Sequence, residues 1–332
     1  MSDALPNGKL PAALLRELLA ASPPLPPEVR LGPRVGEDAC AIDVPAGALV
    51  AATDPITLTG SGVAAHAVVV NANDVAVMGV RPRWFLASVL FPSGTRAADV
   101  RACFAQMQAA LRAADVTLVG GHTEVTSAVT QTVVVGQMLG LATDGRFVPT
   151  GGARPGDAVV QVGPAPIEGA AVLAAEAGAR LAGVDAALRA AAAGALERPG
   201  ISVVACALRA AELGATALHD PTEGGLACGL HELADASGVR IVLDEAAVLW
   251  FEPGVAVCCA LGADPWGTLA SGALLATFPE AHAGRACRAL AESTPSRVIG
   301  RVEAGTGVVH ADGSALREFA RDEVARVLEA ER

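Results

Sequence analysis

A run of apolar residues interrupted by polar ones constrains most strongly what this chain can fold into. The stretch VVVNANDVAVMG, residues 68–79, carries Asn71, Asn73 and Asp74 among valine, alanine and methionine. Asn and Asp compete for backbone hydrogen bonds, so helix formation does not favour them here. Buried without partners, their polar groups would cost free energy. The fold must therefore give these three side chains polar partners.

Patterns typical of helices and strands alternate along both halves of the chain, which predicts a mixed α/β fold with two domains. In the first half, helices are expected at 11–20, 61–79 and 95–115, the last with Thr95 as its N-cap, and strands at 47–54, 84–91, 116–121 and 131–142. The stretch TDGRFVPTGGARPGD is rich in Gly and Pro and predicts a boundary near residue 150. The expected domains are therefore 1–150 and 151–332.

Composition and charge exclude several classes of protein. Apolar residues make up 52% of the chain and charged residues 18%, which is typical of a globular protein. The formal net charge of −11 argues against a nucleic-acid partner. No run of eighteen apolar residues and no export signal is visible, and the seven Cys form no C-x-x-C pair. We therefore expect no membrane span and a cytoplasmic location.

Acidic residues recur at the ends of apolar strands or inside apolar runs. They are Asp38, Asp54, Asp74, Glu124 and Asp220. Each could be an ordinary cap or turn residue. If they converged within about 4 Å, however, each pair would repel by roughly 4 kcal/mol at an effective dielectric near 20. A cluster would therefore need a cation, and oxygen ligands suit Mg²⁺, which usually also holds substrate phosphates.

A nucleotide would have to be bound here without a P-loop. Lys9 is the only lysine, and no G-x-x-x-x-G-K-[ST] sequence exists. The segment PNGKLP around Lys9 predicts a turn before a helix. Lys9 is interpreted either as a solvated residue of the N-terminal tail or as a cation that closes over the nucleotide.

Five motifs resemble, in order, those of the aminoimidazole ribonucleotide (AIR) synthetase superfamily: VGEDACAID, AATD, NANDVAVMGVRP, GGHTEV and DPTEGGL. This superfamily includes selenophosphate synthetase, thiamine-monophosphate kinase and the hydrogenase maturation factor that dehydrates a carbamoyl thioester. The segments DPTEGGLACGLHELADASGVRIVLDE and ADPWGTLASGALLATF most resemble the hydrogenase-maturation branch, and within it proteins called AIR synthase related. The resemblance covers roughly residues 8 to 315.

The resemblance implies a homodimer whose N-terminal domains pair their sheets into a central β-barrel, with ATP and Mg²⁺ bound beside it. The metal ligands implied are Asp38, Asp54, Asp74 and Asp220. The nucleotide-binding residues implied are Gly36, Asn73, Asp74, Gly121, Thr123 and Thr222. The catalytic residues implied are Lys9, His122 and Glu124.

The activity implied is transfer of the γ-phosphate of ATP to an amide or carbonyl oxygen of a small or protein-bound acceptor. The sequence ends RVLEAER without the Cys that carries substrate in the thioester-dehydrating factor, so the carrier-cysteine mechanism is expected to be absent. His122 stands where the kinase branch has Asp. Two alternatives remain: a small-molecule kinase resembling thiamine-monophosphate kinase, and a non-catalytic maturation scaffold. The full set of aspartates argues against the scaffold.

Several other polar residues have both a structural and a functional interpretation. Arg81 and Arg83 could contact phosphate or cover the dimer edge. His219 could orient Asp220. His231 could suggest a metal site, but together with Cys228 it supplies only two ligands, so a structural role is favoured.

Overall fold

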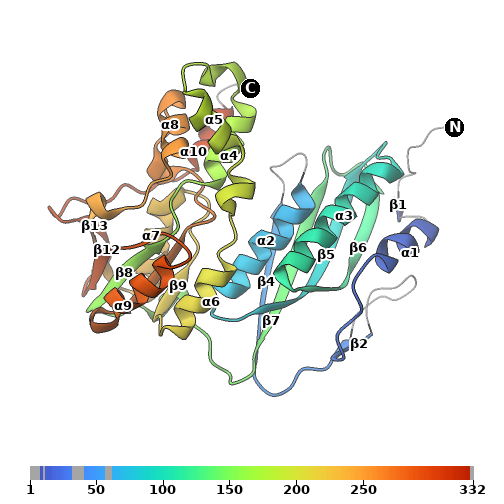
Figure 1. The fold of residues 1–332 in the computed structure, drawn as a ribbon, viewed down its shortest axis with the longest axis horizontal. Helices are drawn as coiled ribbons and strands as arrows, with labels where there is room; N and C mark the ends of the chain where they lie inside the picture. The colour runs from blue at the N-terminus through green and yellow to red at the C-terminus, as the bar shows by residue number, and fades with distance from the viewer. Residues whose placement is uncertain (1–7, 10–11, 32–40, 57–61, 330–332) are drawn as a thin grey trace. The chain divides into compact units, whose positions relative to one another are not determined.

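The chain forms two units, each built around its own sheet (Figure 1). The computed structural model describes residues 8–9, 12–31, 41–56 and 62–329. Unit 1 comprises Met1–Val75 and Val80–Arg146, and unit 2 comprises Ala76–Gly79 and Phe147–Arg332.

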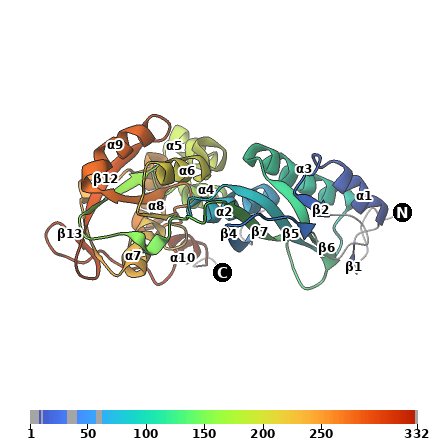
Figure 2. The same ribbon diagram turned by 90° about the horizontal axis from the view of Figure 1, so that it is seen from below.

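Unit 1 contains a mixed sheet whose described strands follow the order β1-β6-β5-β7-β4. These strands are β1 (Gly8–Lys9), β4 (Ala48–Ile56), β5 (Pro82–Pro92), β6 (Thr117–Thr126) and β7 (Val133–Ala142). The helices are α1 (Ala12–Ala20), α2 (Val63–Ala76) and α3 (Ala97–Ala114). Helices α2 and α3 lie on one face of the sheet (Figures 1 and 2).

Alternation along β5 shows which side chains face those helices. Phe85, Ala87, Val89 and Phe91 are buried, whereas Leu86, Ser88 and Leu90 between them are only partly buried. The strand register extends the second set across the sheet. We call this second set the open face: Leu49, Ala51, Thr53 and Pro55 of β4, Leu86, Ser88 and Leu90 of β5, His122 and Glu124 of β6, and Val133, Val135, Gln137, Leu139 and Leu141 of β7.

One end of the open face is covered by a two-stranded sheet of β2 (Val29–Leu31) and β3 (Ala41–Ile42). Val29 packs with Trp84 and Val119 in a small buried cluster, which Ile42 and Leu86 also contact. The remainder is accessible and mixes apolar with polar side chains: Leu49, for example, is 51% exposed, and Gln137 is also exposed.

Unit 2 contains a second mixed sheet, whose described strands follow the order β13-β10-β12-β8-β11-β9. They are β8 (Asp157–Val162), β9 (Ala217–His219), β10 (Arg240–Leu243), β11 (Leu274–Pro279), β12 (Ser296–Glu303) and β13 (Gly307–His310). The helices are α4 (Glu168–Glu176), α5 (Ala186–Ala193), α6 (Val204–Glu212), α7 (Gly225–Ser237), α8 (Glu252–Leu261), α9 (Glu280–Ala291) and α10 (Glu323–Glu329).

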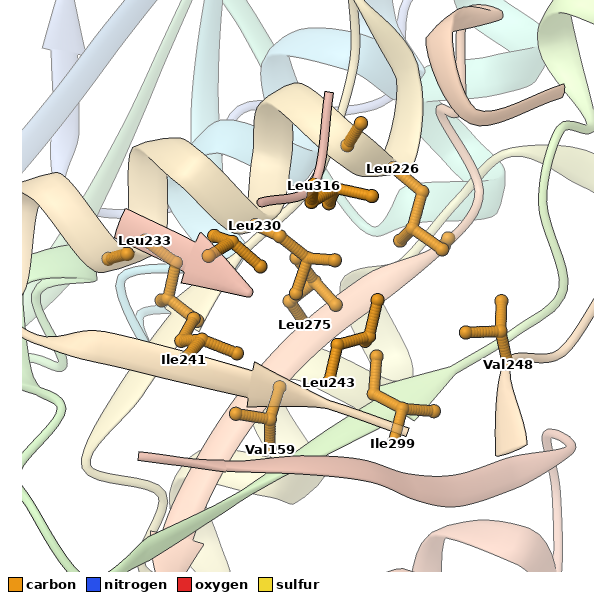
Figure 3. Packing of buried hydrophobic residues seen from close by; sticks show 14 of the residues in the cluster. Val159, Leu226, Leu230, Leu233, Ile241, Leu243, Val248, Leu275, Ile299 and Leu316 are labelled. Atoms are coloured by element: carbon orange, nitrogen blue, oxygen red, sulfur yellow. The ribbon is translucent and has the colours of Figure 1, made fainter. Parts of the chain in front are cut away.

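Helices cover both faces of this second sheet, because its central strands are apolar on both sides. Val159 and Leu275 pack with Leu230 of α7 (Figure 3). Their strand neighbours Val160 and Ala276 pack instead against α6 and α9. A third cluster joins α4, α5, α8 and α10. The mixed α/β class predicted from the sequence is therefore confirmed.

The helices predicted in the first half correspond to α1, α2 and α3, but the predicted N-cap of α3 is wrong. The cap is Arg96, whose backbone N–H donates to Asp99 Oδ2 at 3.3 Å, while the Thr95 hydroxyl donates to the Pro92 carbonyl at 2.7 Å. Thr95 therefore closes the preceding turn.

Among the helices of the described residues, none is by itself long and apolar enough to cross a bilayer. One pair bent by 71°, Ala186–Ala193 with Leu196–Glu212, passes the same test when taken together, on length and composition only.

Candidate functional site

The polar residues in the apolar run of α2 have different surroundings, and Asn71 is the one whose role the structure explains. Its side chain is fully buried and pairs with the backbone of Asp54 on β4. The Asp54 N–H donates to Asn71 Oδ1 at 2.9 Å, and Asn71 Nδ2 donates to the Asp54 carbonyl at 3.3 Å. Nδ2 also donates to the Ala67 carbonyl at 2.9 Å. The sequence marked Asn71 as unusual but gave it no role.

This pairing occupies the edge of the sheet. Strand β4 is the last described strand on its side of the sheet, so no other described strand pairs with its outer edge. The Asn71 amide hydrogen-bonds both backbone groups of Asp54 and so ties this edge strand to α2.

Gly136 on β7 lies directly beneath the Asn71 amide. It is the register partner of both Asp54 and Ala87. A Cβ at position 136 would overlap Asn71 Nδ2 and come within 2.8 Å of the Phe85 ring. Only glycine leaves room for the amide here.

Asp74 lies one helical turn beyond this contact. It follows Asn71 by three residues, about 4.5 Å along the helix axis and on a neighbouring part of the helix surface. The Asp54 side chain shares the face of Gly136 and Ala87, which is the face that the helices cover. Two of the predicted metal ligands, Asp54 and Asp74, therefore belong to one junction between β4 and α2. Asn73, 1% exposed, is about 160° around the helix from Asn71.

The three predicted catalytic residues lie on β6 and the neighbouring β1, at the opposite side of the same sheet. His122 Nε2 lies 3.4 Å from Glu124 Oε2 on β6. Lys9 is the register partner of Glu124, because β1 pairs with β6. The backbone of Lys9 is thus part of the sheet, which differs from the interpretation of Lys9 as a residue of a solvated tail.

Strand order separates these two groups within unit 1. Strands β5 and β7 lie between β6 and β4, so the two edges are roughly 14 Å apart at the usual strand spacing. The faces differ as well, since His122 and Glu124 belong to the open face, whereas Asp54 lies on the helix-covered face. One copy of this sheet therefore does not bring His122 to Asp54.

Two predicted nucleotide-binding residues, Gly121 and Thr123, flank His122 on β6. Gly121 has a φ of +142°, and a Cβ there would overlap the Ala87 carbonyl. Close strand packing thus explains this glycine without a ligand. Thr123 is partly buried on the strand face opposite to His122.

Asp220 and Thr222 belong to unit 2, where the DPTEGG loop joins β9 to α7. Asp220 is 8% exposed. The Thr222 carbonyl accepts hydrogen bonds from the N–H groups of Gly225 and Ala270, both at 3.1 Å. The loop is therefore held by its backbone at the N-terminus of α7.

Asp322, which sequence reasoning missed, anchors the same loop. The Gly224 N–H donates to Asp322 Oδ2 at 2.8 Å, and the Val324 N–H donates to Oδ1 at 2.7 Å. Burial, with a smaller contribution from the nearby Glu223 and Glu168, raises the pKa of the Asp322 carboxyl to about 6, against the lowering effect of both N–H groups. No motif surrounds Asp322, so no sequence signal could have identified it.

The remaining candidates have structural partners. Arg83 pairs with Glu28 and lies over the Trp84 ring, with its guanidinium carbon 4.9 Å from the ring centroid. His219 Nε2 lies 2.8 Å from Glu232 Oε2. His231 Nε2 lies 3.1 Å from the Leu316 carbonyl oxygen, which supports the structural interpretation. Arg81 is exposed.

The carboxylates present fit a magnesium ion bound together with phosphates. Across the described residues, no group of three or more His, Cys, Asp or Glu side chains is arranged to hold a metal by itself. Asp54 and Asp74 supply hard oxygen donors at one junction, and Mg²⁺ commonly takes only one or two protein carboxylates and completes its shell with waters and substrate phosphates. Gly36 and Asp38, also predicted, lie outside the described residues.

Comparison with known proteins identifies the family. The models of the AIR synthase related protein match residues 36–142 for the N-terminal domain and 154–312 for the C-terminal domain. The carbamoyl dehydratase HypE of Cupriavidus necator is 32% identical over 293 residues, 84% of this chain and 78% of that protein. The thiamine-monophosphate kinase of Mycobacterium tuberculosis is 39% identical, but over 112 residues, 33% of this chain and 32% of that protein.

A solved structure extends the likeness to the fold. The hydrogenase maturation protein HypE in complex with ATP superimposes with a TM-score of 0.73 and 25% identity, covering 95% of this chain and 94% of that one. These matches bear out the resemblance inferred from the motifs. The chain is an enzyme of the AIR synthase related family, close to its carbamoyl dehydratase HypE branch.

Proposed function

We propose that this protein uses ATP with Mg²⁺ to phosphorylate, and so activate, an amide or carbonyl oxygen of an acceptor. Similarity to a carbamoyl dehydratase over most of both chains, and to a HypE structure that holds ATP, supports the use of ATP. The observation that supports a bound cation is the contact between β4 and α2. There the Asn71 amide hydrogen-bonds the backbone of Asp54, one helical turn from Asp74.

In this proposal Asp54 and Asp74 of unit 1 hold the cation, assisted by Asp38. Bound Mg²⁺ would neutralise charge on the ATP phosphates. The aspartates orient the nucleotide through the cation. Phosphoryl transfer of this kind needs positioning and charge neutralisation more than covalent chemistry by the protein.

His122 and Glu124 have the chemistry of a proton-transfer pair. Their side chains are 46% and 33% exposed, so an acceptor could reach them from solvent. We assign His122 the exchange of a proton with the acceptor and Glu124 the orientation of the imidazole. Lys9, opposite Glu124 in the sheet, is assigned a charge contact with the γ-phosphate.

The open face supports a homodimer. It presents exposed Leu49 and partly buried Val135 and Leu90 on the side of the sheet that α2 and α3 do not cover. Extended apolar surface of this kind is typical of obligate interfaces. Light scattering tests the proposal: twice the chain mass of 33.2 kDa is expected, and a folded monomer at micromolar concentration would contradict it.

Calorimetric titration of ATP with and without Mg²⁺ tests the central proposal. Binding that depends on Mg²⁺ is expected, because repulsion between Asp74, Asp54 and the phosphates must be neutralised. Equal binding in EDTA would remove the cation from the proposal. No binding under either condition would favour the non-catalytic scaffold.

A kinase that leaves the phosphate on its product is the second candidate. The local identity with a thiamine-monophosphate kinase favours it. Phosphorus NMR of a completed reaction separates the two candidates. Inorganic phosphate in the products supports an activating enzyme, whereas phosphate retained in an organic product supports the kinase.

A further inference from the structure

We propose that Asn71 is a positioning residue that sets the Asp54 carboxylate relative to Asp74 for divalent-cation binding. This inference rests on the proposed function, because it concerns the same cation. It adds a residue that touches neither the cation nor the nucleotide. Its evidence is the set of contacts around one buried amide in unit 1.

The Asn71 amide can take only one orientation. Oδ1 accepts from the Asp54 N–H, and Nδ2 donates to the carbonyls of Asp54 and Ala67. Turning the amide over would lose all three hydrogen bonds and bury unpaired groups. Because the side chain is fully buried, water cannot replace them.

The two bonds to Asp54 hold that residue at both its N–H and its C=O. A strand residue held at both groups cannot rotate about its own axis, so the direction of its side chain is fixed. The same amide belongs to α2, which also carries Asp74. Asn71 therefore fixes β4, which carries the Asp54 carboxylate, relative to α2, which carries the Asp74 carboxylate.

Gly136 on β7 provides the space in which the Asn71 amide lies. Its lack of a side chain lets the amide lie on the sheet between Phe85 and the β4 edge. A methyl group at 136 would push the amide away from Asp54 without removing it. The chain thus offers two independent ways to disturb one contact, from the helix and from the sheet.

Outer residues that orient metal ligands typically change metal affinity by about 10-fold to 100-fold when they are lost. We therefore expect Asn71→Ala and Gly136→Ala each to weaken Mn²⁺ binding at least about tenfold. Mn²⁺ is titrated by electron paramagnetic resonance in the presence of a non-hydrolysable ATP analogue, using the full chain. This reports the cation directly and does not depend on the acceptor.

Two matched controls separate positioning from a general loss of packing. Gly140→Ala lies on the same strand and would bring a Cβ within 2.6 Å of the Arg81 carbonyl and 2.8 Å of Val75 Cγ1, so it disturbs the packing of α2 on β7 without touching the Asn71 amide. Gln108→Ala removes another buried amide of unit 1, one that donates to Ser22 Oγ at 2.6 Å. Both controls should bind Mn²⁺ within about twofold of wild type, even where they lower the melting temperature.

The outcomes separate this inference from the proposed function. Wild-type Mn²⁺ affinity in folded Asn71→Ala and Gly136→Ala would overturn the positioning role and leave Mg²⁺-dependent ATP binding standing. Failure of the wild-type chain to bind Mn²⁺ with nucleotide would overturn both. If neither variant folds, hydrogen exchange of the Asp54 backbone N–H in the wild-type protein is the deciding measurement. Slower exchange when Mn²⁺ and nucleotide bind supports the inference. Unchanged exchange overturns it.

Discussion

The two edges of the unit 1 sheet carry polar residues in opposite settings. At the β4 edge, a buried amide holds the backbone of Asp54, and a helix covers the carboxylate face. At the β6 edge, His122 and Glu124 are exposed and 3.4 Å apart, next to the short strand that bears Lys9. The first setting suits a group whose position must not change. The second suits groups that exchange protons or meet a partner. Residues predicted to share one reaction are thus divided between a rigid site and an accessible one.

Removing a carboxylate from the rigid edge should have the largest effect. We expect Asp54→Asn or Asp74→Asn to weaken Mg²⁺-dependent ATP binding by about 100-fold while the fold is kept, because a direct ligand matters at least as much as its support. Calorimetry at fixed Mg²⁺ measures this. Glu124→Gln, at the other edge, should reduce turnover and leave that affinity unchanged. An equal loss of affinity in Glu124→Gln would erase the distinction between the edges.

Mixing two inactive variants should show whether the edges work together across two copies. Asp74→Asn and His122→Ala are each expected to be inactive. Unfolding and refolding them together forms mixed pairs by chance. If each site takes Asp74 from one copy and His122 from the other, about a quarter of wild-type activity should return. We expect this recovery, because a single sheet keeps the two residues roughly 14 Å apart. No recovery would mean that both residues act within one copy.

Lys9→Ala should lower turnover about tenfold and ATP affinity much less, because its charge contact would strengthen as the γ-phosphate is transferred. Release of ADP and the ATP dissociation constant are measured separately. Lys9→Arg keeps the charge and should retain most of the turnover. If the alanine variant turns over at the wild-type rate, the side chain of Lys9 has no role in turnover, and the residue contributes only its backbone to β1.

The smallest effect concerns Asp322, a buried carboxylate of unit 2 that offers a contrast to both edges. Its pKa in the folded state, about 6, lies above its value of about 3.9 in the unfolded chain, so its contribution to stability is present at low pH and is lost as the pH rises towards 6. Between pH 5 and 7.5 this costs about 1.4 kcal/mol of unfolding free energy. Asp322→Asn should abolish that part of the pH dependence, as measured by chemical denaturation. An unchanged slope would show that other groups titrate instead.

Apolar patterns were sufficient to predict α1 to α3 and β4 to β7 of unit 1, because segments such as α2 and β5 have long apolar runs. The short strands β1, β2 and β3 were not predicted. It could not supply the strand order. His122 follows Asp74 by 48 positions, and nothing in that spacing indicates that β6 lies on the far side of β5 and β7 from β4. The prediction that the aspartates and His122 form a single site therefore went beyond what the pattern contained.

The role of Asn71 was beyond sequence reasoning for a related reason. The oddity of Asn71 was visible, but its partner is the backbone of Asp54, and a backbone contact leaves no signature in the partner's residue type. Gly136 holds the corresponding clue, since a glycine inside an apolar strand often marks a close approach. Connecting the two positions required the register of β7 on β4.

The C-terminal segment determines how much of the chain must be made for unit 2 to fold. The family match ends at residue 312, yet Leu316 and Phe319 complete the core beneath α7, and Val324 and Val327 complete the cluster around α4 and α8. Phe319 also fills the space beside Gly267 that a side chain there would occupy. A gene fragment cut where sequence similarity fades would expose both cores. An expression boundary for this protein therefore belongs after α10.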